Sequence, residues 1–233
     1  MQAVILAGGL GTRLRPVVSD LPKAMAPVGG RPFLEYLLDN LREQGIRDII
    51  LAVGHLRDTI ISHFGNSWRG LNIGYSIETV PLGTGGALKK AALGMPDVPT
   101  VVMNGDTWLE LDLEAMLAAH QRFGADITVA VRHVPDIARY GAVAIAENCI
   151  TGFSEKGMTG PGFINAGVYL LMPSLFGRLS LSDEFSFEHD ILVRYVRDLR
   201  IGAFPTTGRF IDIGVPGDYK LAEHILGQTG NAR

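Results

Sequence analysis

The first 23 residues constrain the fold of this chain most strongly. An apolar run at 3–6 leads directly into Ala7-Gly8-Gly9-Leu10-Gly11-Thr12-Arg13, and Lys23 follows ten residues later. Glycines after a strand let backbone N–H groups approach an anion, and arginine offers a forked donor that matches phosphate oxygens. The segment predicts a phosphate-binding turn at the end of the first strand. A tight strand-to-helix turn without a ligand explains the glycine spacing equally well.

Two familiar glycine motifs do not fit this segment. A Walker A loop needs a lysine followed by Ser or Thr directly after its second glycine, and the chain has none there. The dinucleotide fingerprint needs a third glycine, but Leu14 stands where it is required.

The composition excludes several classes of protein. Apolar residues make up 47% of the 233 residues, charged residues make up 19%, and the net charge is −3 with no basic tract, so no nucleic acid is expected as a partner. No apolar run is long enough for a membrane span. A single cysteine, Cys149, rules out an internal disulfide and favours a cytoplasmic location. A homodimer is compatible with the sequence, which leaves the oligomeric state open.

Apolar runs and helical patterns alternate through the first half of the chain. The runs at 49–53 and 100–103 are typical of strands covered on both faces, and helical patterns occur at 32–44, 58–64, 86–93 and 112–122. This alternation predicts an α/β fold with a doubly wound, mostly parallel, Rossmann-like sheet.

The pattern changes after residue 127. Strand candidates follow closely on one another at 127–132, 142–146, 150–153 and 163–172, with a turn at Glu147-Asn148. They predict an antiparallel or mixed extension of the sheet. A helix at 187–198, a strand at 209–213 and a helix at 216–226 complete the expected single domain, 1–233.

Two aspartates are expected at strand ends, where ligands of open α/β sheets bind. Asp106 lies in Asn104-Gly105-Asp106, directly after the run at 100–103, and Asp212 follows the predicted strand near 209–211. A carboxylate delivered into a glycine turn is a candidate Mg²⁺ ligand, although such an aspartate is more often satisfied within its own turn.

At this point the chain resembles the sugar-1-phosphate nucleotidylyltransferases. The motifs that carry the resemblance keep the family's order through nearly the whole chain: 6–14, Leu21-Pro22-Lys23, Pro81-Leu82-Gly83-Thr84-Gly85-Gly86, Asn104-Gly105-Asp106, Arg139-Tyr140-Gly141, Glu155-Lys156, 165–169 and Asp212-Ile213-Gly214. Within the family, Phe185-Ser186-Phe187-Glu188 makes the chain most similar to guanylyltransferases that act on D-glycero-α-D-manno-heptose 1-phosphate.

The resemblance implies a reaction and a role for each matched residue. A sugar 1-phosphate oxygen attacks the α-phosphorus of a nucleoside triphosphate, GTP in this subgroup, and pyrophosphate leaves. Arg13 and Lys23 would neutralise phosphate charge, and Asp106 and Asp212 would hold Mg²⁺. The residues matched to nucleotide binding are Leu6, Ala7, Gly8, Gly9, Gly11, Thr12, Arg13, Lys23, Glu78, Pro81, Gly83, Thr84, Gly85, Asn104 and Asp106.

A second group of residues is matched to the sugar phosphate: Tyr140, Gly141, Glu155, Lys156, Asn165 and Gly167. On this basis the nucleotide-binding half spans about 1–126 and the sugar-phosphate-binding half about 127–233.

Several alternatives stay open at this point. Glu78 suits guanine recognition, but a uridylyltransferase branch acting on N-acetylmuramic acid 1-phosphate also has Glu there, and a solvent-facing strand end is equally compatible. Mannose 1-phosphate is a further candidate substrate, and a nucleotide-sugar sensor is the non-enzymatic alternative. Glu188-His189-Asp190 is interpreted as an acidic helix start and not as a metal triplet, because consecutive helical residues point in different directions.

Overall fold

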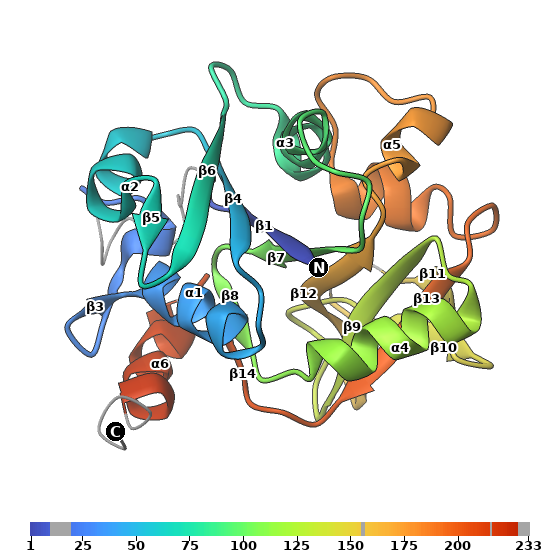
Figure 1. Cartoon of the computed structure of the whole chain (residues 1–233). Helices are drawn as coiled ribbons and strands as arrows, with labels where there is room; N and C mark the ends of the chain where they lie inside the picture. Colours follow the sequence, from blue (N-terminus) through green and yellow to red (C-terminus); the bar gives the residue numbers. More distant parts are fainter. Residues whose placement is uncertain (10–19, 155–156, 215, 228–233) are drawn as a thin grey trace. The chain divides into compact units, whose positions relative to one another are not determined.

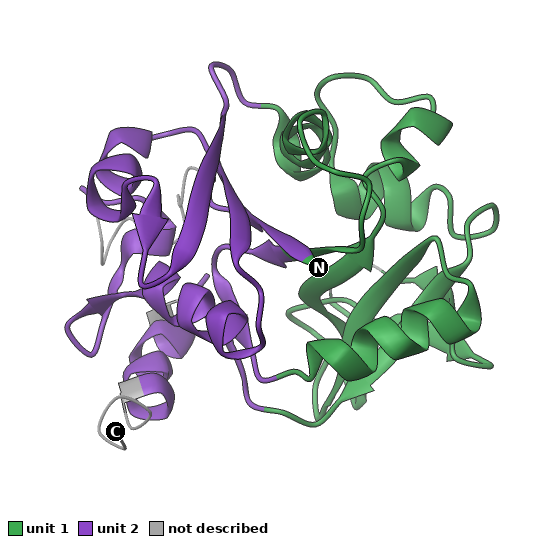
Figure 2. Ribbon diagram, viewed as in Figure 1, with its two compact units in different colours: residues 1, 82–102, 111–208 green, residues 2–81, 103–110, 209–233 purple. Residues whose placement is uncertain are grey.

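The computed structural model describes residues 1–9, 20–154, 157–214 and 216–227 (Figure 1). The chain divides into two compact units, which are described separately (Figure 2). Unit 1 comprises residues 1, 82–102 and 111–208, and unit 2 comprises 2–81, 103–110 and 209–233.

Unit 2 contains the predicted parallel sheet. Strand β1 (Gln2–Leu6) pairs in parallel with β4 (Asp48–Val53), which pairs in parallel with β6 (Leu71–Ile77). The short β5 (Ser67–Trp68) adds an antiparallel edge. The apolar residues of β1, Ala3, Val4 and Ile5, are fully buried, as expected for a strand covered on both faces.

Helix α1 (Phe33–Glu43) matches the predicted helix at 32–44. Its apolar stripe, Phe33, Leu34, Leu37, Leu38 and Leu41, is fully buried. The helix begins after Pro32 and ends before Gly45, whose φ of +81° is the left-handed conformation that commonly follows a helix.

The remaining elements of unit 2 are short, apart from two helices. They are β2 (Pro27–Val28), β3 (Arg31–Pro32), α2 (Arg57–Phe64), α6 (Pro216–Gly227), the 3-10 turn η1 (Lys23–Met25), and the antiparallel pair β8 (Thr107–Leu109) and β14 (Phe210–Asp212).

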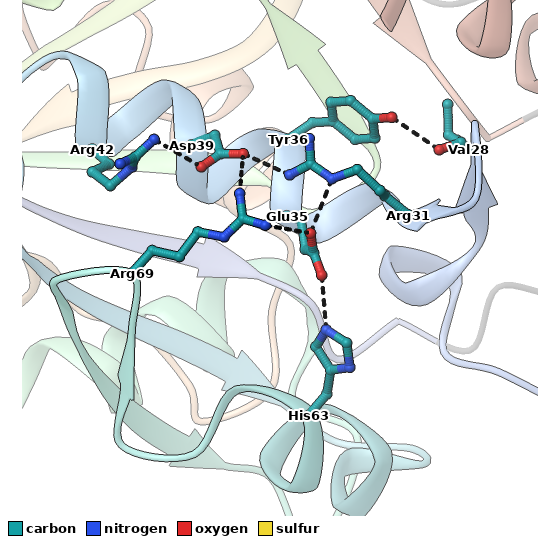
Figure 3. A network of polar contacts seen from close by, with 8 residues as sticks. All are labelled: Val28, Arg31, Glu35, Tyr36, Asp39, Arg42, His63 and Arg69. Carbon is teal, nitrogen blue, oxygen red and sulfur yellow. Dashed lines mark hydrogen bonds and ion pairs between the residues drawn. The ribbon is translucent and has the colours of Figure 1, made fainter. Parts of the chain in front are cut away.

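An ionic network joins α1 to its neighbours in unit 2 (Figure 3). The Glu35 carboxylate contacts Arg31 Nε at 3.0 Å and His63 Nε2 at 2.9 Å, and Asp39 Oδ2 contacts Arg31 at 2.6 Å and Arg69 at 3.3 Å. Burial by itself would lower the pKa of Arg31, but its hydrogen bonds to Asp39 and Glu35 outweigh this effect and raise that pKa. The network therefore links the three segments that carry Arg31, His63 and Arg69 to one face of α1.

Unit 1 contains the predicted mixed extension, with strand order β10-β11-β13-β9-β12. The strands are β9 (Ile127–Val134), β10 (Val143–Ala146), β11 (Cys149–Phe153), β12 (Gly162–Leu171) and β13 (Ile201–Thr206). All neighbours pair antiparallel except β13 and β9, which are parallel. Glu147 and Asn148 form the predicted turn, with φ values of 50° and 64°. The sequence interpretation missed β13.

The helices of unit 1 include one correction. Helix α3 (Gly83–Ala92), helix α4 (Leu113–Phe123) and the single turn α5 (Leu175–Arg178) are α-helical, while β7 (Thr100–Asn104) has residues in both units. The predicted helix at 187–198 is instead a π-helix, η2 (Phe187–Val193), followed by turns. The N–H of Arg194 donates to the carbonyl of His189, five residues earlier. In the described part of the chain, no helix has the length and apolarity needed to cross a membrane.

Candidate functional site

Three charged residues that the sequence singled out lie together in unit 2. Lys23 comes from η1, Asp106 from the turn between β7 and β8, and Asp212 from the end of β14. The Lys23 ammonium and the Asp106 carboxylate form an ion pair, with the lysine side chain 12% exposed and the aspartate side chain 31% exposed. Pairing of β14 with β8 places Asp212 opposite Thr107, the neighbour of Asp106.

Gly214 shows how closely these groups approach. Its N–H donates to Asp212 Oδ1 at 2.6 Å. A Cβ at this position would lie 2.6 Å from Asp212 Oδ1 and 2.9 Å from Lys23 Nζ. Both distances are shorter than a normal contact, so only glycine leaves room for the carboxylate and the ammonium together. The third residue of the Asp212-Ile213-Gly214 motif therefore has a steric role.

The short β8–β14 pair is held at both ends. The N–H of Ile213 donates to the Asp106 carbonyl at 2.9 Å, and the N–H of Glu110 donates to the Arg209 carbonyl at 2.9 Å. The Arg209 side chain and backbone N–H also donate to the Glu110 carboxylate, at 3.1 and 3.2 Å, and these two hydrogen bonds lower the pKa of Glu110. The segments of β8 and β14, about 100 residues apart in the sequence, therefore hold Asp106 and Asp212 at fixed positions relative to each other.

The start of the glycine loop is packed against neighbouring backbone. The N–H of Gly105 donates to the Leu6 carbonyl at 3.0 Å, and that of Ala7 to the Ala52 carbonyl at 2.8 Å. A Cβ on Gly8 would lie 2.5 Å from Glu78 Oε1, so the Glu78 carboxylate lies beside the loop. Glu78 is half-buried and so keeps some exposure to solvent, and both interpretations of this residue stay predictions.

Several predicted site residues lie outside the described residues, namely Gly11, Thr12, Arg13, Glu155 and Lys156. Their expected roles stay predictions. Of the other residues matched to the nucleotide, Gly9 and Pro81 are exposed, and Asn104 is half-buried. The side-chain oxygen of Asn104 is buried and accepts no hydrogen bond from the described residues.

The residues around Asp106 fit a small, hard cation. Asp106 and Asp212 offer carboxylate oxygens, and the buried Asn104 oxygen lies two residues from Asp106. Within the described ranges, no cluster of three or more His, Cys, Asp or Glu side chains suited to a metal exists. A site with one or two carboxylates, completed by substrate phosphates and water, is the arrangement that Mg²⁺ prefers over an all-protein cage.

In unit 1, the glycines of 83–86 serve close packing. A Cβ on Gly83 would lie 2.5 Å from the Phe185 carbonyl oxygen, and one on Gly86 would lie 2.1 Å from that of Asp183. The N–H of Gly85 donates to the Phe185 carbonyl at 3.0 Å. The start of α3 therefore packs directly against residues 183–187. The sequence did not predict this contact.

Tyr140 and Gly141 form part of a turn in unit 1. The N–H groups of both residues donate to the Ile137 carbonyl, at 2.9 and 3.1 Å, and Gly141 has a φ of +80°. Ser154 and Gly157 donate to the carbonyls of Ala142 and Ala138, so the residues flanking 155–156 are bonded to the same turn.

Asn165 lies beside a β-bulge of β12. The register with β9 shifts between Asn165 and Tyr169, and Gly167 has a φ of +71°. The Gly167 N–H donates to Asn165 Oδ1 at 3.0 Å, and Asn165 Nδ2 donates to the Tyr169 hydroxyl at 2.9 Å. The motif residues Asn165 and Gly167 are therefore in contact, and Tyr169 adds a partner that the sequence interpretation left without a role.

The sequence pattern of the nucleotidyl transferase family matches residues 2–228. The chain therefore belongs to this family of nucleotidyltransferases, which confirms the resemblance read from its motifs.

Individual relatives and solved structures show which members of the family this chain is similar to. The chain is 44% identical to a D-glycero-α-D-manno-heptose 1-phosphate guanylyltransferase of Aneurinibacillus thermoaerophilus, over 97% of this chain and 98% of the relative. Its fold is similar to the crystal structure of HddC from Yersinia pseudotuberculosis, with a TM-score of 0.87, 38% identity, and coverage of 97% and 99%. HddC has also been solved in complex with GMP-PN.

A more distant relative has a longer chain. A mannose-1-phosphate guanyltransferase of Emericella nidulans is 36% identical over 94% of this chain, which spans 62% of that relative. The relatives and the HddC fold confirm the predicted α/β class, and the relatives named here transfer guanylyl groups.

Proposed function

We propose that this chain transfers GMP from GTP to a heptose 1-phosphate, releasing pyrophosphate and forming a GDP-heptose. The observation that carries the proposal is the grouping of Lys23 with Asp106 and Asp212, two aspartates at strand ends, in a member of the nucleotidyl transferase family. The relative of nearly equal length that acts on heptose 1-phosphate supports the choice of sugar.

The residues of unit 2 act on phosphate charge in this proposal. The transferred phosphoryl group spreads negative charge over its oxygens in the transition state, so fixed cations accelerate the reaction. Lys23 would exchange its contact with Asp106 for an α-phosphate oxygen, and Arg13 would bind the departing pyrophosphate. Asp106 and Asp212 would hold Mg²⁺, which supplies charge neutralisation between the two phosphate groups.

Glu78 and the glycine loop would bind the rest of the nucleotide. The backbone of Gly8 and Gly9 is compatible with a close approach of phosphate. A carboxylate beside this loop can accept two parallel hydrogen bonds from the N1–H and exocyclic amine of guanine, which adenine does not offer in that arrangement.

The residues of unit 1 act on the sugar phosphate. Lys156 would bind the phosphate, Glu155 would accept from sugar hydroxyls, and Asn165, Tyr140 and the Gly141 backbone would complete the sugar pocket. The hydrogen bonds of Asn165 and the turn at Tyr140 support this assignment, because the Asn165 carboxamide and the Tyr140 backbone are each held by hydrogen bonds. Mannose 1-phosphate is the second candidate, favoured by the mannose-specific relative. The cytoplasm remains the expected compartment, and a homodimer remains compatible.

The test is a matrix of GTP, ATP, UTP and CTP against heptose, mannose, glucose and N-acetylmuramic acid 1-phosphates, read by pyrophosphate release. We expect the highest kcat/KM for GTP with the heptose phosphate and no release when either substrate is omitted. Release with UTP and the muramic acid phosphate instead would overturn the choice of base and sugar. Binding of nucleotide sugars without any release would establish the sensor alternative.

A further inference from the structure

Glu188 is the centre of a hydrogen-bond network in unit 1 that the proposed function does not use. Its Oε2 accepts from the Thr84 hydroxyl at 2.6 Å and from the Ser186 hydroxyl at 3.2 Å, and its Oε1 accepts from the Tyr169 hydroxyl at 3.3 Å. Among the residues that the structure describes, no Lys, Arg or His forms an ion pair with it. A half-buried carboxylate is thus satisfied by hydroxyl groups, each of which must point its proton at it.

The direction of these bonds fixes the next residue in the chain of contacts. Because the Tyr169 proton is committed to Glu188, its oxygen acts as the acceptor for Asn165 Nδ2 at 2.9 Å. At the other end of the carboxamide, Asn165 Oδ1 accepts the Gly167 N–H at 3.0 Å. A flipped carboxamide would place N–H against N–H at Gly167 and an acceptor against an acceptor at Tyr169, so only one orientation satisfies all four groups.

Packing holds the network in place. The Tyr169 ring is fully buried and meets the Phe187 ring edge-on, with centroids 4.9 Å apart. The Phe187 N–H donates to the Thr84 hydroxyl oxygen at 2.9 Å, which leaves the Thr84 proton for Glu188. Glu188 lies in the π-helix η2, a rare conformation that is frequent at functional sites.

We infer that Glu188 is a positioning residue for sugar recognition: through the Tyr169 hydroxyl it fixes the Asn165 carboxamide with one N–H and one acceptor lone pair left for a sugar hydroxyl. A hydroxyl both donates and accepts, so it matches this remaining pair. The inference rests on the proposed role of Asn165 in binding the sugar 1-phosphate. Glu188 touches no substrate in this account.

The first experiment compares Tyr169→Phe and Glu188→Gln with the wild type in the GTP and heptose 1-phosphate assay. Tyr169→Phe removes the hydroxyl that connects Glu188 to Asn165, a connection that we call the relay. Glu188→Gln keeps the shape of the side chain but puts N–H groups where hydroxyls donate. We expect KM for the sugar phosphate to rise about 5- to 20-fold while KM for GTP changes less than about 2-fold. Tyr195→Phe, which removes an exposed hydroxyl from a half-buried ring of unit 1, and Glu184→Gln, at an exposed position, are matched controls and should leave both constants unchanged.

A double-mutant cycle separates positioning from a structural role. In an Asn165→Ala background, Tyr169→Phe should raise KM for the sugar phosphate less than about 2-fold further, because the group that the relay orients is gone. An undiminished effect in that background would overturn the inference. A Tyr169→Phe variant whose sugar and GTP constants rise equally would also overturn it, since loss of folded structure affects both substrates.

A measurement without turnover distinguishes this inference from the proposed function. In ¹⁵N-labelled protein without substrates, the side-chain amide signals of Asn165, assigned by their loss in Asn165→Ala, should shift in both Tyr169→Phe and Glu188→Gln and stay in place in Tyr195→Phe. Unshifted Asn165 signals refute the relay. If the signals shift and Asn165→Ala leaves KM for the sugar phosphate unchanged, the relay exists and the proposed role of Asn165 in sugar binding is wrong, which overturns the inference for sugar recognition.

Discussion

Two groups of carboxylates, one in each unit, have different partners. In unit 2, Asp106 pairs with an ammonium, and Glu35 and Asp39 pair with guanidinium groups (Figure 3). In unit 1, Glu188 is bound by three hydroxyl groups. An ammonium group such as that of Lys23 can approach a carboxylate from many directions, whereas a hydroxyl must aim its single proton, so it transmits an orientation to the next group. In the proposed function, the Lys23–Asp106 group would neutralise phosphate charge, and the Glu188 network would orient Asn165 toward sugar hydroxyls.

Removing charge from unit 2 gives the largest expected effect. Asp106→Asn keeps the size of the side chain and removes the charge that pairs with Lys23 and, in the proposed reaction, holds the metal. We expect kcat to fall by about 10³-fold or more, because electrostatic stabilisation of the transition state is lost. Steady-state pyrophosphate release checks this result.

The matched control for that prediction is Asp58→Asn, the same change on an aspartate of unit 2 whose side chain is 93% exposed. It should retain wild-type kcat. An Asp106→Asn variant with kcat within 10-fold of the wild type would remove the distinction between the two units, since charge in unit 2 would then not drive the reaction.

Crowding the charged cluster without changing its charge gives the next largest effect. In Gly214→Ala, the new methyl group would lie 2.6 Å from Asp212 Oδ1 and 2.9 Å from Lys23 Nζ, so one or both groups must move. We expect kcat/KM to fall about 10- to 100-fold with little change in thermal stability, because a misplaced group of this kind loses its contact with the reacting phosphate.

Gly217→Ala is the control for Gly214→Ala, since a Cβ there has no atom within 4 Å. Kinetic measurements on both variants, with circular dichroism to check folding, separate a local effect on Lys23 and Asp212 from a loss of folded structure. Normal kinetics in Gly214→Ala would mean that the spacing of Lys23 and Asp212 does not matter for turnover.

The sequence predicted much of this molecule, and its failures have physical reasons. Long periodic segments such as α1 and continuous apolar runs such as β4 were predicted because one residue type repeats at the helical or strand period. The positions of Asp106 and Asp212 at strand ends were predicted because glycines mark the ends of those strands, while their roles stay predictions. Strand β13 was missed because Gly202 and Pro205 interrupt its apolar run.

The Glu188 network could not be predicted from the sequence, for a different reason. Thr84 lies 104 positions from Glu188, so no local pattern shows that the two side chains are partners. The acidic residues at the start of the 187–198 helix fit a favourable helix terminus, and that local explanation concealed the tertiary one. Likewise, the glycines at 83–86 were matched to a ligand, while their packing against residues 183–187 needed the fold.

The ion network around Glu35 in unit 2 is expected to stabilise the fold without taking part in turnover. Glu35→Gln weakens the contacts to Arg31, His63 and Arg69 (Figure 3). We expect a loss of about 1 to 3 kcal/mol in the free energy of unfolding, because the partially buried partners lose a charged acceptor. Both KM values and kcat should stay within 2-fold. Urea denaturation beside the kinetic assay checks this, with the exposed Glu43→Gln on the same helix as control.

The smallest expected effect concerns a titrating group of unit 1. His120 is buried, and burial lowers its pKa despite the opposing effect of Asp126, while its Nδ1 contacts the Thr128 hydroxyl at 2.9 Å. The unfolded chain then binds a proton on this imidazole more readily than the folded protein does, so the free energy of unfolding falls as the pH drops through the ordinary histidine range near 6.5. Urea midpoints at pH 7.5 and 5.5 should differ less in His120→Gln than in the wild type, whereas the exposed His55→Gln should keep the wild-type difference.

Equal pH dependence in His120→Gln and wild type would show that this imidazole is protonated alike in the folded and unfolded states. If the kinetic constants of His120→Gln match those of the wild type at each pH, this titration affects the stability of the fold and not turnover.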